Sequence, residues 1–188
     1  MDSIALAYWM RPRFAITIDY GQKSVAGEIR AAAAVAAELG LEHYIETVDI
    51  RSLGSGDLAG TPALPIAAVP EWWPFRNQFL ITIAAMKAVA VGSDQLLIGL
   101  VKSDSSHADG TPEFIDAMKL ALRLQEGAIR LDAPAMNLTT SQLVVRSGIP
   151  RELLAWAHSC HVAGYSCGLC RGCRKHYTTY EELGATPF

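Results

Sequence analysis

The stretch FAITIDYGQ, residues 14–22, joins an apolar run to a short polar end. The run Phe14–Ile18 is typical of a buried strand, and Asp19–Gln22 predicts the turn that follows it. The alanine-rich stretch 24–39 predicts a helix, and 43–48 predicts a second strand. A strand, a helix and a strand in close succession predict a parallel α/β unit.

The same alternation continues along the chain. Further helices are expected at 2–10, 77–91, 112–126, 139–146 and 150–156, with a short last helix closed by Glu181 and Glu182, and further strands at 95–100 and 129–132. This order predicts an α/β fold, a parallel sheet flanked by helices of the Rossmann-like type. Ligands of such sheets bind beyond the carboxyl ends of the strands, where 19–22, 48–49 and 99–109 supply polar residues. The region 52–74 is dense in Gly, Pro and Ser and predicts a long loop.

The cysteines gather near the C-terminus, at Cys160, Cys167, Cys170 and Cys173. Disulfide frameworks are typical of short secreted chains, whereas this chain has 188 residues and is 51% hydrophobic. Two C-x₂-C turns that share a cysteine are typical of a structural zinc site, in which four thiolates close a tetrahedral shell. Reduced thiols and an iron–sulfur cluster remain as alternatives.

Charged residues and histidines near the cysteines could interact with a bound metal ion. Arg171, Arg174 and Lys175 would offset the negative charge of a zinc ion held by four thiolates. Nearby histidines could each replace a cysteine as ligand, but four cysteines already complete the shell, so we expect the histidines to be bystanders. They are His158, His161 and His176.

Composition narrows the classes of partner. The net charge of −3 gives no global basic field for nucleic acid. The longest apolar run, residues 79–86, is too short to cross a bilayer, so no membrane partner is expected. Nothing indicates export, and we expect a cytoplasmic protein that forms a homodimer.

Several motifs together resemble the 7-cyano-7-deazaguanine synthases, the QueC family of adenine nucleotide alpha-hydrolase-like ATP pyrophosphatases. Met1-Asp2-Ser3 resembles the end of the family's SGGxDS phosphate loop. The other motifs are DYGQ at 19–22 with Glu28-Ile29 after it, PFRN at 74–77, Asp104 placed five residues after Gly99, DGTPEF at 109–114 in place of DCRPEF, and C-x₆-C-x₂-C-x₂-C at 160–173. In this order they are jointly specific, and the resemblance covers nearly the whole chain.

The resemblance implies an ATP-dependent ligase of queuosine biosynthesis, with structural zinc, ATP and Mg²⁺ as cofactors. In this family ATP adenylates the carboxylate of 7-carboxy-7-deazaguanine, and ammonia then displaces AMP. A second adenylation and loss of water give the nitrile. Such chemistry needs backbone N–H groups at a helix N-terminus for phosphate, cations against developing charge, and carboxylates for Mg²⁺.

The resemblance also implies which residues form the site. The catalytic set would be Ser3, Arg76, Lys102 and Asp104. The nucleotide set would be Asp2, Ser3, Asp19, Tyr20, Gln22, Arg76 and Gly99. The acceptor set would be Lys102, Asp104, His107, Asp109, Gly110, Thr111 and Glu113. Simpler roles stay open: an N-cap at Ser3, a surface ion pair at Arg76, and a solvated loop residue at Lys102.

Two departures from the family pattern matter. The first is at the start of the sequence: the family's Ser-Gly-Gly and the strand before it would precede Met1 and are not in the given sequence. That strand is central to the family's sheet. We expect the sequence to begin too late, with the natural start further upstream. The alternative is a degenerate protein that binds ATP poorly.

The second departure lies in the acceptor set. Gly110 and Thr111 stand where the family has Cys-Arg, and the loop 105–108 before them is one residue shorter. The change removes the natural bidentate partner of a carboxylate and is expected to leave room in the pocket. A carboxylate bound there would rely on Lys102, Arg76 or backbone donors. We therefore expect slow turnover of 7-carboxy-7-deazaguanine unless another cation compensates.

Three functions remain possible. The first is an enzyme of the QueC type that acts on a deazapurine carboxylate. The second is a paralogue that adenylates another acceptor, including a protein or nucleic-acid end, as in antiphage defence, and the third is a non-catalytic zinc-stabilised module.

Residues 1–157 are expected to form the ATP pyrophosphatase-like α/β domain, without its first strand and Ser-Gly-Gly. Residues 158–188 are expected to form a zinc-binding segment of the same domain.

Overall fold

The computed structural model describes residues 1–186, so the last two residues of the predicted zinc-binding segment lie outside the description. The strands β1 (Phe14–Asp19) and β2 (Glu42–Thr47) form a parallel pair in which Phe14 lies opposite Glu42. The helix α2 (Val25–Leu39) connects them, as predicted, and ends at Gly40 in the left-handed conformation, with φ of 67°. This is the parallel unit expected from the stretch 14–22.

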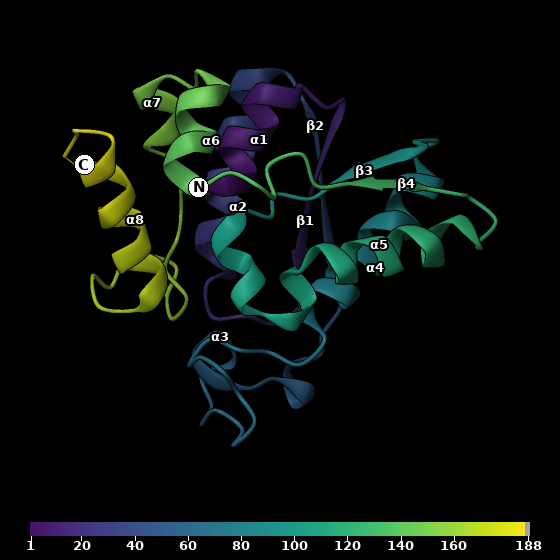
Figure 1. Ribbon diagram of the computed structural model, residues 1–188, viewed down its shortest axis with the longest axis horizontal. Helices are drawn as coiled ribbons and strands as arrows, with labels where there is room; N and C mark the ends of the chain where they lie inside the picture. The colour runs from purple at the N-terminus through teal and green to yellow at the C-terminus, as the bar shows by residue number, and fades with distance from the viewer. Residues whose placement is uncertain (187–188) are drawn as a thin grey trace.

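A second parallel pair is formed by β3 (Gln95–Leu97) and β4 (Arg130–Asp132), which α5 (Pro112–Arg123) connects. The helix α4 (Arg76–Ala90) contacts both β1 and β3 and so bridges the two pairs (Figure 1). The predicted fold class, parallel strands flanked by helices, is confirmed. The expected single sheet is divided, because in the described chain no ladder of backbone hydrogen bonds joins β1 to β3.

Three predicted bounds are wrong. The strand expected at 95–100 ends at Leu97, because β4, with which it forms its ladder, is itself three residues long. The helix expected to reach residue 126 ends at Arg123. The last helix, α8 (Arg171–Glu182), is not short but 12 residues long. It begins directly after Cys170, whose sulfur accepts the N–H of Cys173 and so acts as an N-cap.

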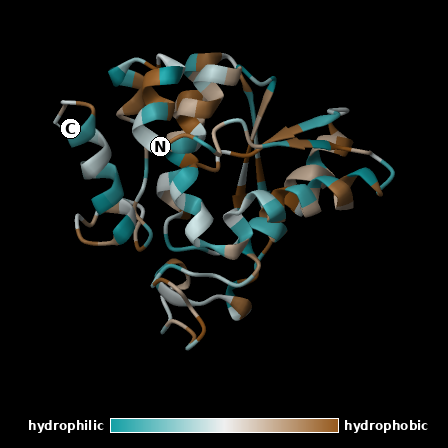
Figure 2. Ribbon diagram, in the orientation of Figure 1, coloured by the Kyte–Doolittle hydropathy of each residue, from teal (hydrophilic) through white to brown (hydrophobic). Residues whose placement is uncertain are grey.

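The helices α1 (Asp2–Met10), α6 (Thr140–Ser147), α7 (Arg151–Leu154) and α8 pack together on one side of the β1–β2 pair (Figure 1). Their shared core includes Ala5 and Leu143, both 0% exposed. Apolar ribbon is concentrated where α1 and α6 meet and along the strands (Figure 2). Within residues 1–186, no helix has both the length and the apolar composition needed to cross a bilayer.

The predicted loop 52–74 contains a short helix, α3 (Gly56–Ala59), which follows the 3₁₀ turn η1 (Arg51–Leu53). Trp73 anchors this loop, since its side chain is 2% exposed and packs edge-on against the ring of Tyr20 at 4.9 Å. The loop is therefore held against the end of β1, the edge at which the sequence predicts a site.

Candidate functional site

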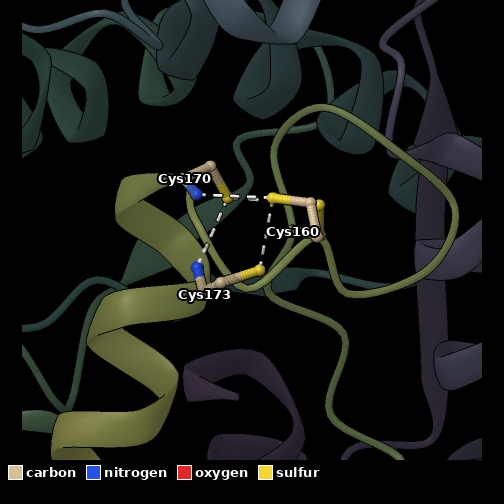
Figure 3. Close-up of side chains that lie close together, drawn as sticks. Cys160, Cys170 and Cys173 are labelled. Atoms are coloured by element: carbon tan, nitrogen blue, oxygen red, sulfur yellow. Dashed lines mark hydrogen bonds between the residues drawn. The ribbon is translucent and has the colours of Figure 1, made fainter.

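The four cysteines come together as predicted, with their Sγ atoms all within 4.8 Å of one another. Figure 3 shows Cys170 and Cys173 at the start of α8 and Cys160 facing them from the preceding loop. The Sγ atoms are 3.9 Å apart between Cys167 and Cys173 and 4.0 Å apart between Cys160 and Cys170. Four sulfurs at about 2.3 Å from one tetrahedral ion would lie about 3.8 Å from one another. The cluster therefore has the dimensions of a site for a single metal ion.

Backbone N–H groups also favour thiolates in this cluster. The N–H groups of Cys170 and Leu169 point at the sulfur of Cys167 and lower the pKa of that thiol to about 6. Burial has the opposite effect on Cys170 and raises the pKa of its thiol to about 12. A bound cation would supply the positive charge that a buried thiolate needs.

A pocket of about 220 Å³ lies beside the cysteine cluster. Residues in the first turns of four helices line it, namely Asp2 of α1, Arg76 of α4, Thr140 of α6 and Gly172 of α8, and Lys175 lies in the next turn of α8. The rest of its lining is Met1, Tyr20, Glu28, Leu58, His158, Ser159, Cys160, His161, His176 and Thr179. Because helix N-termini carry partial positive charge, this convergence favours an anionic ligand.

The ammonium group of Lys175 joins two acidic residues at this pocket. Its Nζ donates a hydrogen bond of 2.9 Å to Oδ2 of Asp2 and lies 3.9 Å from Oδ1 of Asp104. Burial alone would raise the pKa of Asp2, but the amino group of Met1 and Lys175 outweigh it and hold that pKa below its ordinary value. The Asp2 side chain is therefore an ionised carboxylate, and its hydrogen bond to Lys175, near the other end of the chain, holds it in place.

Three polar atoms of the pocket lining are buried without a hydrogen-bond partner among the described residues. They are Oδ1 of Asp2, Oγ1 of Thr140 and Nδ1 of His161. Buried polar groups in native proteins nearly always have a partner, and a bound ligand or water would supply it. The pocket is thus built to receive a polar molecule.

Tyr20 and Arg76, both in the predicted nucleotide set, meet at the same pocket. Burial raises the pKa of the Tyr20 hydroxyl far above its usual value, while the nearby Arg76 guanidinium acts in the opposite direction. Arg76 follows Phe75, which adopts a left-handed backbone conformation with φ of 55°. This turn begins α4 and directs the arginine to the pocket, while the Phe75 side chain is 75% exposed.

The rest of the predicted nucleotide set lies at the strand ends. A side chain on Gly99 would lie 3.1 Å from Cα of Ser3, so the two predicted residues are in close contact and Ser3 itself is exposed. Asp19 accepts the N–H of Gly21 in the turn after β1. Gln22 is 2% exposed, and its amide is bonded within the protein to Tyr20, Ile18 and Glu28, so it supports the turn.

The predicted acceptor set forms a separate region, in which only Asp104 reaches the pocket, through Lys175. It comprises the 3₁₀ turns η2 (Lys102–Ser106) and η3 (Ala108–Gly110) and the start of α5. Asp109 accepts the N–H of Asn77 at 3.0 Å, which ties this loop to the beginning of α4. Lys102 and Glu113 are exposed, His107 is half-buried, and none of the three lines the pocket.

The expectation that Gly110 and Thr111 leave room for a ligand is wrong. Gly110 is buried, and a Cβ at this position would lie only 2.1 Å from the carbonyl oxygen of Asp104. Thr111 is the N-cap of α5, since its hydroxyl accepts the N–H of Phe114 and donates to the carbonyl of Ala108. Backbone packing, not an empty space, occupies this part of the loop.

Several residues of the pocket were not predicted from the sequence to lie there. Thr140 carries no motif signal, and Lys175 was expected only to balance the charge of the metal. His158, His161 and His176, expected to be bystanders of the metal, line the pocket instead, outside the group of four potential ligands. Their place depends on how α8 packs against α1 and α6, and no local pattern in the sequence encodes that packing.

Comparisons with known proteins agree on one family. A family model described as queuosine biosynthesis protein QueC matches residues 1–184. The 7-cyano-7-deazaguanine synthase of Desulforudis audaxviator is 30% identical over 198 residues, which cover 93% of this chain and 89% of that protein. The enzyme of the same name from Thiobacillus denitrificans is 34% identical over 191 residues, covering 90% and 83%.

A solved structure shows the same fold. The U34-tRNA thiolase NcsA from Methanococcus maripaludis, determined with its [4Fe-4S] cluster, aligns with a TM-score of 0.52 and 16% identity. The alignment covers 97% of this chain and 61% of the thiolase, so the chain spans less than two thirds of that protein. At this identity the likeness extends to the fold alone.

Proposed function

The chain belongs to the QueC family of queuosine biosynthesis proteins, and we propose that it is an enzyme that makes 7-cyano-7-deazaguanine from 7-carboxy-7-deazaguanine, ATP and ammonia. The observation that supports this most directly is the pocket at which α1, α4, α6 and α8 begin. An adenylating enzyme must bind phosphate groups and a carboxylate together, and both are anions that helix N-termini favour.

The chemistry divides into two activations. The acceptor carboxylate attacks the α-phosphate of ATP, pyrophosphate leaves, and ammonia then displaces AMP from the acyl adenylate to give the amide. A second ATP adenylates the amide oxygen, and departure of that oxygen with AMP gives the nitrile. The net change at the acceptor is replacement of a carboxylate by a nitrile, and both carboxylate oxygens leave as oxygens of the two AMP molecules.

We assign the residues to roles from their positions. Ser3 and Gly99, which contact one another, and Asp19 would surround the nucleotide at the strand ends. Arg76, which lines the pocket, would offset the charge of the phosphates. Asp2 and Asp104 carry carboxylates, the ligands that suit Mg²⁺. They would hold a magnesium ion beside the phosphates of ATP.

For the cysteine cluster we propose zinc. An iron–sulfur cubane carries each of its four thiolates on a different iron, so its sulfurs stand further apart than those around one ion. Mutual sulfur distances below 4.8 Å favour the single ion, and zinc is the metal that four thiolates bind most commonly in structural sites. Its role would be to fix the start of α8, and with it Lys175, beside the pocket.

The test is product formation by the purified protein with ATP, Mg²⁺, ammonium and 7-carboxy-7-deazaguanine. We expect AMP and pyrophosphate to accumulate together, and mass spectrometry to detect 7-cyano-7-deazaguanine. Omission of the acid should abolish AMP release, because adenylation needs the acceptor. Release of AMP with no conversion of the deazapurine would overturn the proposed acceptor, and no release of AMP with any carboxylate would overturn the enzyme.

A further inference from the structure

The acceptor's carboxylate needs a cation, and the loop at 109–114 provides none. Thr111 stands where an arginine was expected, and its hydroxyl is engaged with the backbone of Ala108 and Phe114. Two cationic side chains with long stems line the pocket, Arg76 and Lys175. Arg76 lies with Tyr20 in the part of the pocket assigned to the nucleotide, whereas Lys175 lies beside Asp2 and Asp104, where the phosphates and the acceptor carboxylate must meet.

Lys175 has hydrogen-bonding capacity to spare. An ammonium group has three N–H donors, and in the described chain only one of them is used, in the bond to Asp2. The 3.9 Å separation from Asp104 is too long for a second hydrogen bond. The Lys175 side chain is 38% exposed, so a ligand entering the pocket can reach it.

Thr140 provides an independent observation at the same place. It is 6% exposed, lines the pocket, and its Oγ1 is buried beside the Asp2 carboxylate, whose pKa it helps to lower, with no hydrogen bond of normal geometry among residues 1–186. It is the first residue of α6, which has eight residues and whose N-terminal N–H groups favour an anion. A hydroxyl without a well-formed hydrogen bond therefore faces the same pocket as a lysine with unused donors.

We propose that Lys175 and Thr140 bind the carboxylate of 7-carboxy-7-deazaguanine and make this pocket selective for the acid. The inference rests on the proposed function and names the subsite in which its acceptor is held. A carboxylate fits better than a phosphate because Asp2 lies 2.9 Å from the ammonium group, and its charge would repel a dianion more strongly than a monoanion. Lys175 thus provides the compensating cation in place of the missing arginine.

The experiment compares binding of two compounds that differ in charge, measured by calorimetry without ATP. The acid, 7-carboxy-7-deazaguanine, carries the carboxylate, and the nitrile, 7-cyano-7-deazaguanine, is neutral. We expect Lys175→Met to weaken binding of the acid by roughly 10- to 100-fold, as loss of a charged hydrogen bond does, and to leave the nitrile unaffected. Lys175→Arg should keep most of the preference for the acid.

The matched control is Arg123→Met, which removes the same charge from an exposed position of α5, outside the pocket. It should bind both compounds as the unmodified protein does. Unchanged affinity of folded Lys175→Met for the acid would overturn the proposal. So would equal weakening for acid and nitrile, or a loss of affinity for ATP with none for the acid.

A second variant keeps the test decisive if Lys175→Met does not fold. Thr140→Val replaces the hydroxyl by a methyl group of similar size, and we expect a few-fold loss of affinity for the acid alone; no change would overturn the role of Thr140. Binding and turnover separate the two proposals. Charge-selective binding that depends on Lys175, without AMP release, would leave this inference standing while the proposed function fails.

Discussion

The ammonium group of Lys175 lies 2.9 Å from Oδ2 of Asp2, although the two residues are 173 positions apart in the chain. The pair connects the last helix to the first. Because Cys170 is the N-cap of α8 and Lys175 lies two residues after Cys173, the cysteine cluster lies at the start of the helix that carries the lysine to the pocket. A metal ion at the cysteines would therefore stabilise the fold and the pocket together.

Removal of one metal ligand should show this link. Cys170 is both a ligand candidate and the N-cap of α8, and its sulfur also accepts the N–H of His161. We expect Cys170→Ser to lose zinc and thermal stability together, because the free energy of ligation is part of the free energy of folding. A loss on the order of 3 kcal/mol would lower Tm by roughly 6–12 °C.

Metal content by mass spectrometry and melting by calorimetry would check this expectation. The exposed Arg123→Met variant on α5 serves as control, since it keeps all four cysteines and the cations beside them. A wild-type protein that carries no metal, and that melts at the same temperature before and after treatment with a chelator, would contradict it. Iron in place of zinc would contradict the choice of metal alone.

Replacement of Arg76 should affect the nucleotide more than the fold. Its guanidinium lines the pocket and has no ion-pair partner among the described residues. If it contacts phosphate, Arg76→Ala should weaken Mg-ATP binding by about 10-fold or more, since one charged hydrogen bond is worth about 1.5–3 kcal/mol. Calorimetric titration would measure the loss, with the exposed Arg123→Ala as control. Unchanged affinity for ATP would remove Arg76 from the nucleotide site.

Local patterns in the sequence predicted most of the helices and strands. The apolar run at 14–18, the alanine-rich stretch 24–39 and the glycine after it each encode their element through short-range effects, and the structure contains all three. The four cysteines could be paired with one metal ion because their spacing alone limits the geometry. The prediction was weaker for β3, because strand length depends on a partner strand distant in the chain.

The pocket could be predicted only in part, for a related reason. Asp2, Tyr20 and Arg76 belong to motifs that can be recognised one at a time, and they do line it. Thr140 and Lys175 belong to no such motif, and their place follows from the packing of α6 and α8 against α1. Contacts across the whole length of the chain, such as that between Lys175 and Asp2, have no local signature in the sequence.

The packing around Gly110 leads to a further prediction. Because a Cβ would lie 2.1 Å from the Asp104 carbonyl oxygen, we expect Gly110→Ala to destabilise the protein by about 1–3 kcal/mol. Gly164→Ala is the control, since its Cβ would meet Ala26 at an ordinary 3.4 Å and no positive φ is involved. Urea denaturation of both variants would measure the difference. Equal stability of the two would show that the loop at 104–110 gives way easily.

Acid sensitivity is expected from His176, a half-buried histidine whose Nδ1 lies 3.2 Å from the Ser159 hydroxyl oxygen. Burial, helped by the positive charges of the Met1 amino group and His158, lowers the pKa of His176 to about 4. An unfolded chain takes up this proton near pH 6.5, whereas the folded protein does not until about pH 4. The contribution of His176 to stability is therefore full above pH 6.5 and is lost progressively as the pH falls toward 4.

Replacement of this ring should remove that part of the pH dependence. We expect His176→Phe, which keeps an aromatic ring beside Tyr180, to lose less stability than the unmodified protein between pH 6.5 and pH 4. Ser159→Ala removes the hydrogen bond but keeps the histidine, so it should lower the urea midpoint and retain the slope with pH. Both variants are compared at equal metal content, because acid also protonates the cysteines. Parallel pH profiles for His176→Phe and the unmodified protein would mean that His176 titrates alike in the folded and unfolded chains.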